Sequence, residues 1–125
     1  RELKKKQGDI DFPLMLENFR KLPLEKWSYL RDERQTPKIG PYAEDFNRLF
    51  VEPFNLSYRE DFNPEKQMST EHLDAVKLSV LKALSLETQD IREKNYELEE
   101  RIESLERENQ KLRAEIREIH ALLKE

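Results

Sequence analysis

The chain contains no cysteine, and its only two glycines and all six prolines lie before residue 65. The absence of cysteine excludes disulfides, thiolate metal sites and thiol nucleophiles. No apolar run approaches the roughly 20 residues that a membrane-spanning helix needs, so no membrane partner is expected. The first six residues are basic, but no apolar stretch follows them, which is unlike a signal peptide.

Charged residues are abundant and nearly balanced in sign. They make up 40% of the 125 residues against 36% hydrophobic residues, and the net charge is −4. A composition this polar is typical of a coiled coil with a small head rather than of one compact globule. The net negative charge gives no general attraction to nucleic acid, and no basic helix leads into the heptads as a leucine-zipper protein would require. We therefore expect no nucleic-acid partner.

The positions of proline and glycine divide the chain into a head, residues 1–68, and an uninterrupted helix, residues 69–125. Ser69 or Thr70 can cap this helix, which at 1.5 Å per residue would be on the order of 80 Å long. The expected fold class is mainly α. It has a small α+β head with a short β-hairpin, followed by a long C-terminal helix that forms a parallel, trimeric coiled coil.

The head shows short local patterns. We expect Trp27 to anchor its core, and residues 51–68 to form a packed loop because they carry aromatic side chains without a period. The regular elements expected before that loop are a helix that starts at Asp11 and stops at Pro23, a hairpin pairing residues 27–31 with 38–40, and a short helix opened by Pro41.

The most informative pattern is a heptad seam between residues 84 and 123, in which one position recurs at alternating spacings of four and three. A single helix cannot bury such a stripe, so the seam predicts an oligomer. The seam consists of Leu84, Thr88, Ile91, Asn95, Leu98, Ile102, Leu105, Asn109, Leu112, Ile116, Ile119 and Leu123.

The number of strands in the coiled coil stays open from the helix alone. Isoleucine at heptad position a, leucine at d and asparagine at a, here Asn95 and Asn109, favour two strands. Against this, residues 101–106 match the Arg-h-x-x-h-Glu pattern of many short parallel trimers. Arg101 at position g could form an ion pair with Glu106 at position e of a neighbouring chain.

Two motifs in the head carry a resemblance to a known family. Leu-Pro-x-x-x-Trp-x-Tyr at residues 22–29 leads into Ile-Gly-Pro-Tyr-Ala-Glu-Asp-Phe at residues 39–46. This order resembles the C-terminal intramolecular chaperone domain of phage endosialidases, tail spikes and tail fibres, and the corresponding domain of the myelin regulatory factor. The motif residues that carry the resemblance are Gly40, Pro41, Ala43, Glu44, Asp45 and Phe46.

The resemblance implies an activity. In that family a Ser-Asp-x-x-x-Lys motif opens the domain, the chain is cut before the serine, and the lysine is the base of a Ser–Lys dyad. Residues 1–4 match the second half of the motif, which places the lysine at Lys4 and the serine before Arg1. A serine hydroxyl needs such a base because it is a weak nucleophile at neutral pH. Without that serine the chain as it stands cannot cleave itself.

The resemblance also implies a role and a place. The expected partners are two further copies, a dimer being the runner-up, and the β-rich stalk that precedes the domain in its own precursor. The expected location is the cytoplasm of a host bacterium during phage assembly, with release from the mature particle after cleavage. The alternative is a non-cleaving trimerisation module that stays attached as a structural rod.

The remaining candidate residues have plain structural interpretations. Gly40 is expected to permit a strand-to-helix turn that a side chain would obstruct. His72 and His120 lack the spacing of metal ligands and are expected at the surface, so neither a metal nor a cofactor is expected.

Overall fold

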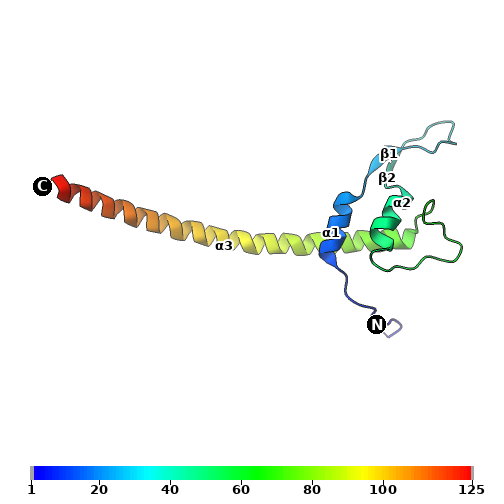
Figure 1. Cartoon of the computed structure of the whole chain (residues 1–125), viewed down its shortest axis with the longest axis horizontal. Helices are drawn as coiled ribbons and strands as arrows, with labels where there is room; N and C mark the ends of the chain where they lie inside the picture. The colour runs from blue at the N-terminus through cyan, green and yellow to red at the C-terminus, as the bar shows by residue number, and fades with distance from the viewer. Residues whose placement is uncertain (1, 125) are drawn as a thin grey trace. The chain divides into compact units, whose positions relative to one another are not determined.

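The computed structural model describes residues 2–124 as a mainly helical protein with one two-stranded hairpin (Figure 1). The chain divides into two compact units, Arg1–Ser85 and Leu86–Glu125, and the last helix continues without a break from the first into the second. The elements are α1 (Phe12–Lys21), β1 (Glu25–Trp27), β2 (Lys38–Gly40), α2 (Ala43–Phe46), the π-helix η1 (Asn47–Val51) and α3 (Thr70–Lys124). This arrangement confirms the expected fold class as far as a single chain can show it.

Helix α1 begins and ends where the sequence predicts. The Asp11 carboxylate accepts a hydrogen bond from the Leu14 backbone N–H at 3.1 Å, which satisfies one of the free donors of the first turn. Pro13 lies in that turn, where its missing N–H costs nothing. Leu22 is extended because Pro23 disfavours helical backbone in the residue before it, so the helix ends at Lys21.

The hairpin forms earlier in the sequence than predicted. Strand β1 pairs antiparallel with β2, with Glu25 opposite Gly40 and Trp27 opposite Lys38, so the prediction of a first strand over residues 27–31 was wrong. Trp27 is half-buried against Tyr29 and Tyr42 and does not belong to the core, which also corrects its predicted role. A strand with polar residues on both sides has weak sequence signals, and here the pairing partner decides its position.

The short helix that Pro41 was expected to open widens into a π-helix. The Glu52 N–H bonds to the Asn47 carbonyl five residues earlier at 3.1 Å, as a π-helix requires. This wider turn buries almost every side chain from Phe46 to Val51, and only Arg48 remains exposed. The segment therefore fills the core from more sides than an amphipathic α-helix would.

The core lies between α1, the α2–η1 segment and the first turns of α3. Asn18 ties two of these elements together, because its buried side-chain amide donates to the Leu49 carbonyl at 2.7 Å. The start of α3 is fixed by the Ser69 hydroxyl, which accepts from the His72 N–H at 3.3 Å, as predicted for a cap at Ser69. The buried apolar residues are Met15, Leu16, Phe46, Leu49, Phe50, Val51, Val76, Val80 and Ala83.

Asn47 holds the long loop between η1 and α3 against this core. Its side chain is 1% exposed, and its Nδ2 donates to the carbonyl oxygens of Pro64 and Gln67, both at 2.7 Å. The loop also packs Phe54 and Tyr58 on the core, which fits the expectation of a packed loop over residues 51–68. Because these bonds join residues 17 and 20 positions apart, one side chain stabilises a whole irregular segment.

Candidate functional site

The candidate functional site is the heptad seam on α3. Each of its large aliphatic side chains beyond residue 90 is between 48% and 79% exposed in the single chain, and Asn95 and Asn109 are exposed as well. A stripe of this length exceeds the single apolar residues that are usual on a protein surface, and such stripes are typical of interaction surfaces. The aliphatic residues in question are Ile91, Leu98, Ile102, Leu105, Leu112, Ile116, Ile119 and Leu123.

The first turns of α3 separate the face that packs on the head from the seam. Val80 and Ala83 point into the core, where they are 6% and 2% exposed. Leu81 and Leu84, on the neighbouring face, are 63% and 43% exposed. The head therefore leaves the seam free, and the seam extends one layer earlier than predicted. Sequence reasoning missed Leu81, although the four-and-three spacing counted back from Leu84 reaches it.

Arg101 and Glu106 lie on opposite flanks of the seam, at positions g and e, and both are exposed. Five residues along a helix separate two side chains by about 140° around its axis, so the two groups face different directions. The structure does not bring them together within one chain. Their predicted ion pair therefore requires a neighbouring copy.

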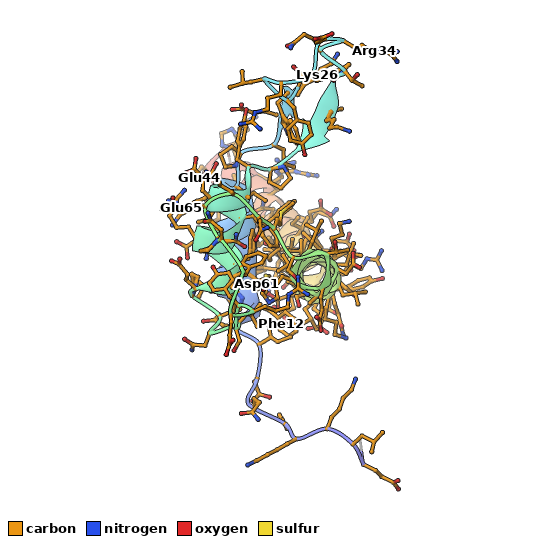
Figure 2. All side chains as sticks on the ribbon, turned by 90° about the vertical axis from the view of Figure 1, so that its right-hand side faces the viewer. Phe12, Lys26, Arg34, Glu44, Asp61 and Glu65 are labelled. Atoms are coloured by element: carbon orange, nitrogen blue, oxygen red, sulfur yellow. The ribbon has the colours of Figure 1, made fainter. Side chains whose placement is uncertain are left out.

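Lys4 lies in an N-terminal segment without regular structure, in which every residue from 2 to 11 is exposed. Figure 2 shows this segment leaving the head beyond Phe12, at the opposite end from the hairpin residues Lys26 and Arg34. The single chain therefore does not hold Lys4 against the head. Its predicted role as the base of a dyad stays a prediction.

The motif residues 40–46 lead from the hairpin into the core. Phe46 is 1% exposed, and its ring packs against that of Phe50 in a tilted arrangement, with 5.5 Å between the ring centroids. Glu44 and Asp45 lie in the first turn of α2, where the helix dipole favours acidic side chains, and Asp45 pairs with Arg48 at 3.0 Å. Pro41 and Ala43 connect β2 to this turn without being fully buried.

Gly40 differs from its predicted role. A Cβ atom at Gly40 would meet no atom within 4 Å, and the residue does not adopt a left-handed conformation. The single chain therefore gives no steric reason for glycine at this position. The prediction that a side chain would obstruct the turn was wrong for the isolated chain.

Replacing Gly40 by alanine is expected to stabilise the isolated head by about 0.4–1 kcal/mol, because alanine restricts the unfolded chain and fits the folded one. Urea denaturation of the chain at low concentration measures this difference. Gly8→Ala is the matched control and should give no gain, because Gly8 adopts φ +148°, which L residues rarely do. A loss of stability for Gly40→Ala would contradict the open environment that the structure gives this residue.

A pocket of about 560 Å³ lies beside the start of α3, between the loop residues Tyr58 and Arg59 and the first-turn residue His72. The Tyr58 hydroxyl and His72 Nδ1 are buried there without a hydrogen-bond partner, and their rings meet edge to face at 6.1 Å. Burial raises the pKa of the Tyr58 hydroxyl above its ordinary value. His72 is thus half-buried and not at the surface, which corrects its prediction.

Among residues 2–124 no group of three or more acidic, histidine or cysteine side chains is placed to hold a metal ion. Within the same residues, no helix is long and apolar enough to cross a membrane. No protein-family model, no curated protein and no solved structure matches the chain. The resemblance to intramolecular chaperone domains therefore stays a prediction from the sequence.

Proposed function

We propose that the chain is an intramolecular chaperone that trimerises, folds a β-rich tail-spike-like or fibre-like protein preceding it, and is released by autoproteolysis. The observation that carries the proposal is the exposed seam of α3, which its own head leaves uncovered at Leu81 and Leu84. The head motifs at residues 22–29 and 39–46 support the resemblance to intramolecular chaperone domains, and this resemblance is the basis for the proposed chaperone role.

The seam would act by holding three chains together, so that their stalk segments need not find one another by diffusion. Intertwined β structures fold slowly because distant segments must meet before any contact rewards them. Three chains joined through α3 raise the effective concentration of their preceding stalks to the millimolar range or so. Strand pairing between chains then becomes a local event. This role predicts that the stalk misfolds when residues 1–125 are deleted, and a soluble trimeric stalk made without them would contradict it.

We prefer the trimer to the dimer because residues 101–106 match the Arg-h-x-x-h-Glu pattern of parallel trimers and because the resemblance of the head implies three copies. The Asn95 and Asn109 layers favour the dimer, which is therefore the alternative stoichiometry. Sedimentation equilibrium of the chain distinguishes a mass of three copies from a mass of two. A monomer at micromolar concentration would overturn the proposal.

Release would depend on Lys4 and on a serine two residues before Arg1. Lysine can accept the serine proton only when burial or nearby positive charge lowers its basicity, and assembly of three copies could supply both. In a longer chain with about 100 native residues upstream, we expect intact mass to show a break two residues before Arg1. Lys4→Ala should abolish the break, and Lys5→Ala is the matched control that should not.

The second candidate function is a non-cleaving trimerisation module that stays attached to its stalk. The exposed position of Lys4 favours it, because a dyad base has to be held against its serine. An unbroken mass for the longer chain would select this alternative. On either account the proposed location is a bacterial host during phage assembly.

A further inference from the structure

Two rows of exposed charges border the seam of α3. Between residues 94 and 120, the heptad positions g, each directly before an a residue, carry Lys94, Arg101, Glu108 and Glu115. Positions e, just after each d residue, carry Glu99, Glu106, Arg113 and His120. In a parallel coiled coil, each g residue meets the e residue five positions later in a neighbouring copy.

Parallel copies in register place opposite charges together in three of the four pairs, and the fourth pair is a glutamate with a histidine. Lys94 and Arg101 each meet a glutamate, while Glu108 meets an arginine and Glu115 meets a histidine. The pairs, each written as g residue and e residue of a neighbouring copy, are Lys94 with Glu99, Arg101 with Glu106, Glu108 with Arg113, and Glu115 with His120. No pair within this set is repulsive.

The seam itself leaves one alternative register open. Asn95 and Asn109 are two heptads apart, so a slip of fourteen residues still places Asn95 of one copy beside Asn109 of another. One buried amide pair survives that slip, while each of the other two asparagines faces a leucine, Leu81 or Leu123, of the other copy. The asparagines alone therefore disfavour a slip of one heptad more strongly than a slip of two.

The charges oppose this slip because it reverses the pairing. A two-heptad slip brings Lys94 to Arg113 and two pairs of glutamates together. Those repulsive pairs are Lys94 with Arg113, Glu108 with Glu99, and Glu115 with Glu106. An antiparallel arrangement fails for another reason, because each asparagine at position a would face a leucine or isoleucine at d and leave its amide unpaired.

We propose that these two rows form a charge code that selects further copies of this chain, parallel and in register, and excludes the two-heptad slip. The inference rests on the proposed oligomerisation and adds its orientation and register. In the single chain the residues of both rows are exposed and therefore available to pair with another copy. The one described intrachain contact among them, Lys94 with Asp90 at 3.1 Å, joins two exposed side chains. Such exposed pairs are weak and exchange readily.

The absence of native cysteine allows disulfides to report the register. A chain carrying both Leu98→Cys and Leu112→Cys can form links 98–98 and 112–112 in register, or 98–112 after a two-heptad slip. Peptide mapping after oxidation distinguishes the three. We expect the in-register links to exceed the 98–112 link by about tenfold or more, since several attractive pairs would become repulsive.

Reversing one row tests whether charge is the cause. We expect reversal of row g to raise the 98–112 link by about tenfold relative to the in-register links, or to abolish assembly. The matched control reverses row e as well and should restore the original pattern. Row g is reversed by Lys94→Glu, Arg101→Glu, Glu108→Lys and Glu115→Lys, and row e by Glu99→Lys, Glu106→Lys and Arg113→Glu.

The outcomes separate this inference from the proposed function. A g-reversed chain that assembles with unchanged in-register links would overturn the charge code and leave oligomerisation intact. A wild-type chain that sediments as a monomer would overturn both. Loss of assembly on reversing row g supports the code when reversing row e restores it, and contradicts the code when it does not.

Discussion

Replacing Ile102 by aspartate is expected to raise the dissociation constant of the assembled chain by more than a hundredfold, equivalent to at least about 3 kcal/mol. Ile102 lies in the middle of the seam, so every copy would bring a carboxylate into the same desolvated layer. Burying an unpaired charge costs several kcal/mol, and the aliphatic contact is lost as well. Sedimentation equilibrium, with helix content from circular dichroism, measures the change.

Tyr96→Asp is the matched control. Tyr96 is 69% exposed in the single chain and Ile102 is 53% exposed, so exposure alone gives no reason for the isoleucine to be the more sensitive of the two. Only the heptad seam distinguishes them, because Tyr96 lies at position b, away from it. We expect Tyr96→Asp to leave the assembled mass unchanged. Equal loss of assembly in both variants would show that the seam is not the interface.

The elements that the sequence predicts well are those determined by neighbouring residues. Helix α1 starts at an aspartate cap with a proline in its first turn and ends before a second proline. Helix α3 starts at Thr70, directly after its capping residue Ser69, and contains no proline or glycine. These signals act within one or two turns of the chain, so they require no knowledge of tertiary packing.

The features that escaped prediction depend on partners distant in sequence. The position of β1 is set by its pairing with β2, in which Trp27 lies opposite Lys38 and Glu25 lies opposite Gly40. The widening of α2 into the π-helix η1 depends on the core, which takes up side chains from more than one face of this segment. Asn47 gave no signal, because its partners are loop carbonyls whose positions follow from the fold and from no local pattern.

The candidate site shows the same division. The four-and-three spacing places the seam residues on one stripe of α3, because heptad phase is a local property of a helix. The same spacing reaches Leu81, and the structure adds that Val80 and Ala83 face the head while Leu81 stays exposed. The dyad role of Lys4 involves residues outside one copy of the described chain, so no property of the single chain decides it.

Replacing Asn47 by aspartate is expected to destabilise the head by about 3–5 kcal/mol at neutral pH, with almost no change in side-chain volume. The Asn47 amide donates to two loop carbonyl oxygens, whereas an ionised carboxylate can only accept. The substitution would leave both carbonyls unpaired and place a negative charge against them. Urea denaturation of the chain, compared with wild type, measures the loss.

Two comparisons isolate the cause of this loss. Asn63→Asp lies in the same loop, but the Asn63 side chain accepts from the Glu65 N–H at 3.1 Å, so a carboxylate preserves the bond and stability should change by less than about 0.5 kcal/mol. Acid should partly rescue Asn47→Asp. Burial against carbonyls raises the pKa of the introduced carboxyl above its unfolded value of about 3.9. The destabilisation caused by its negative charge is therefore complete above the folded pKa and disappears below the unfolded pKa. Equal stability of the two variants at pH 7 would show that Asn47 does not hold the loop through its donor hydrogens.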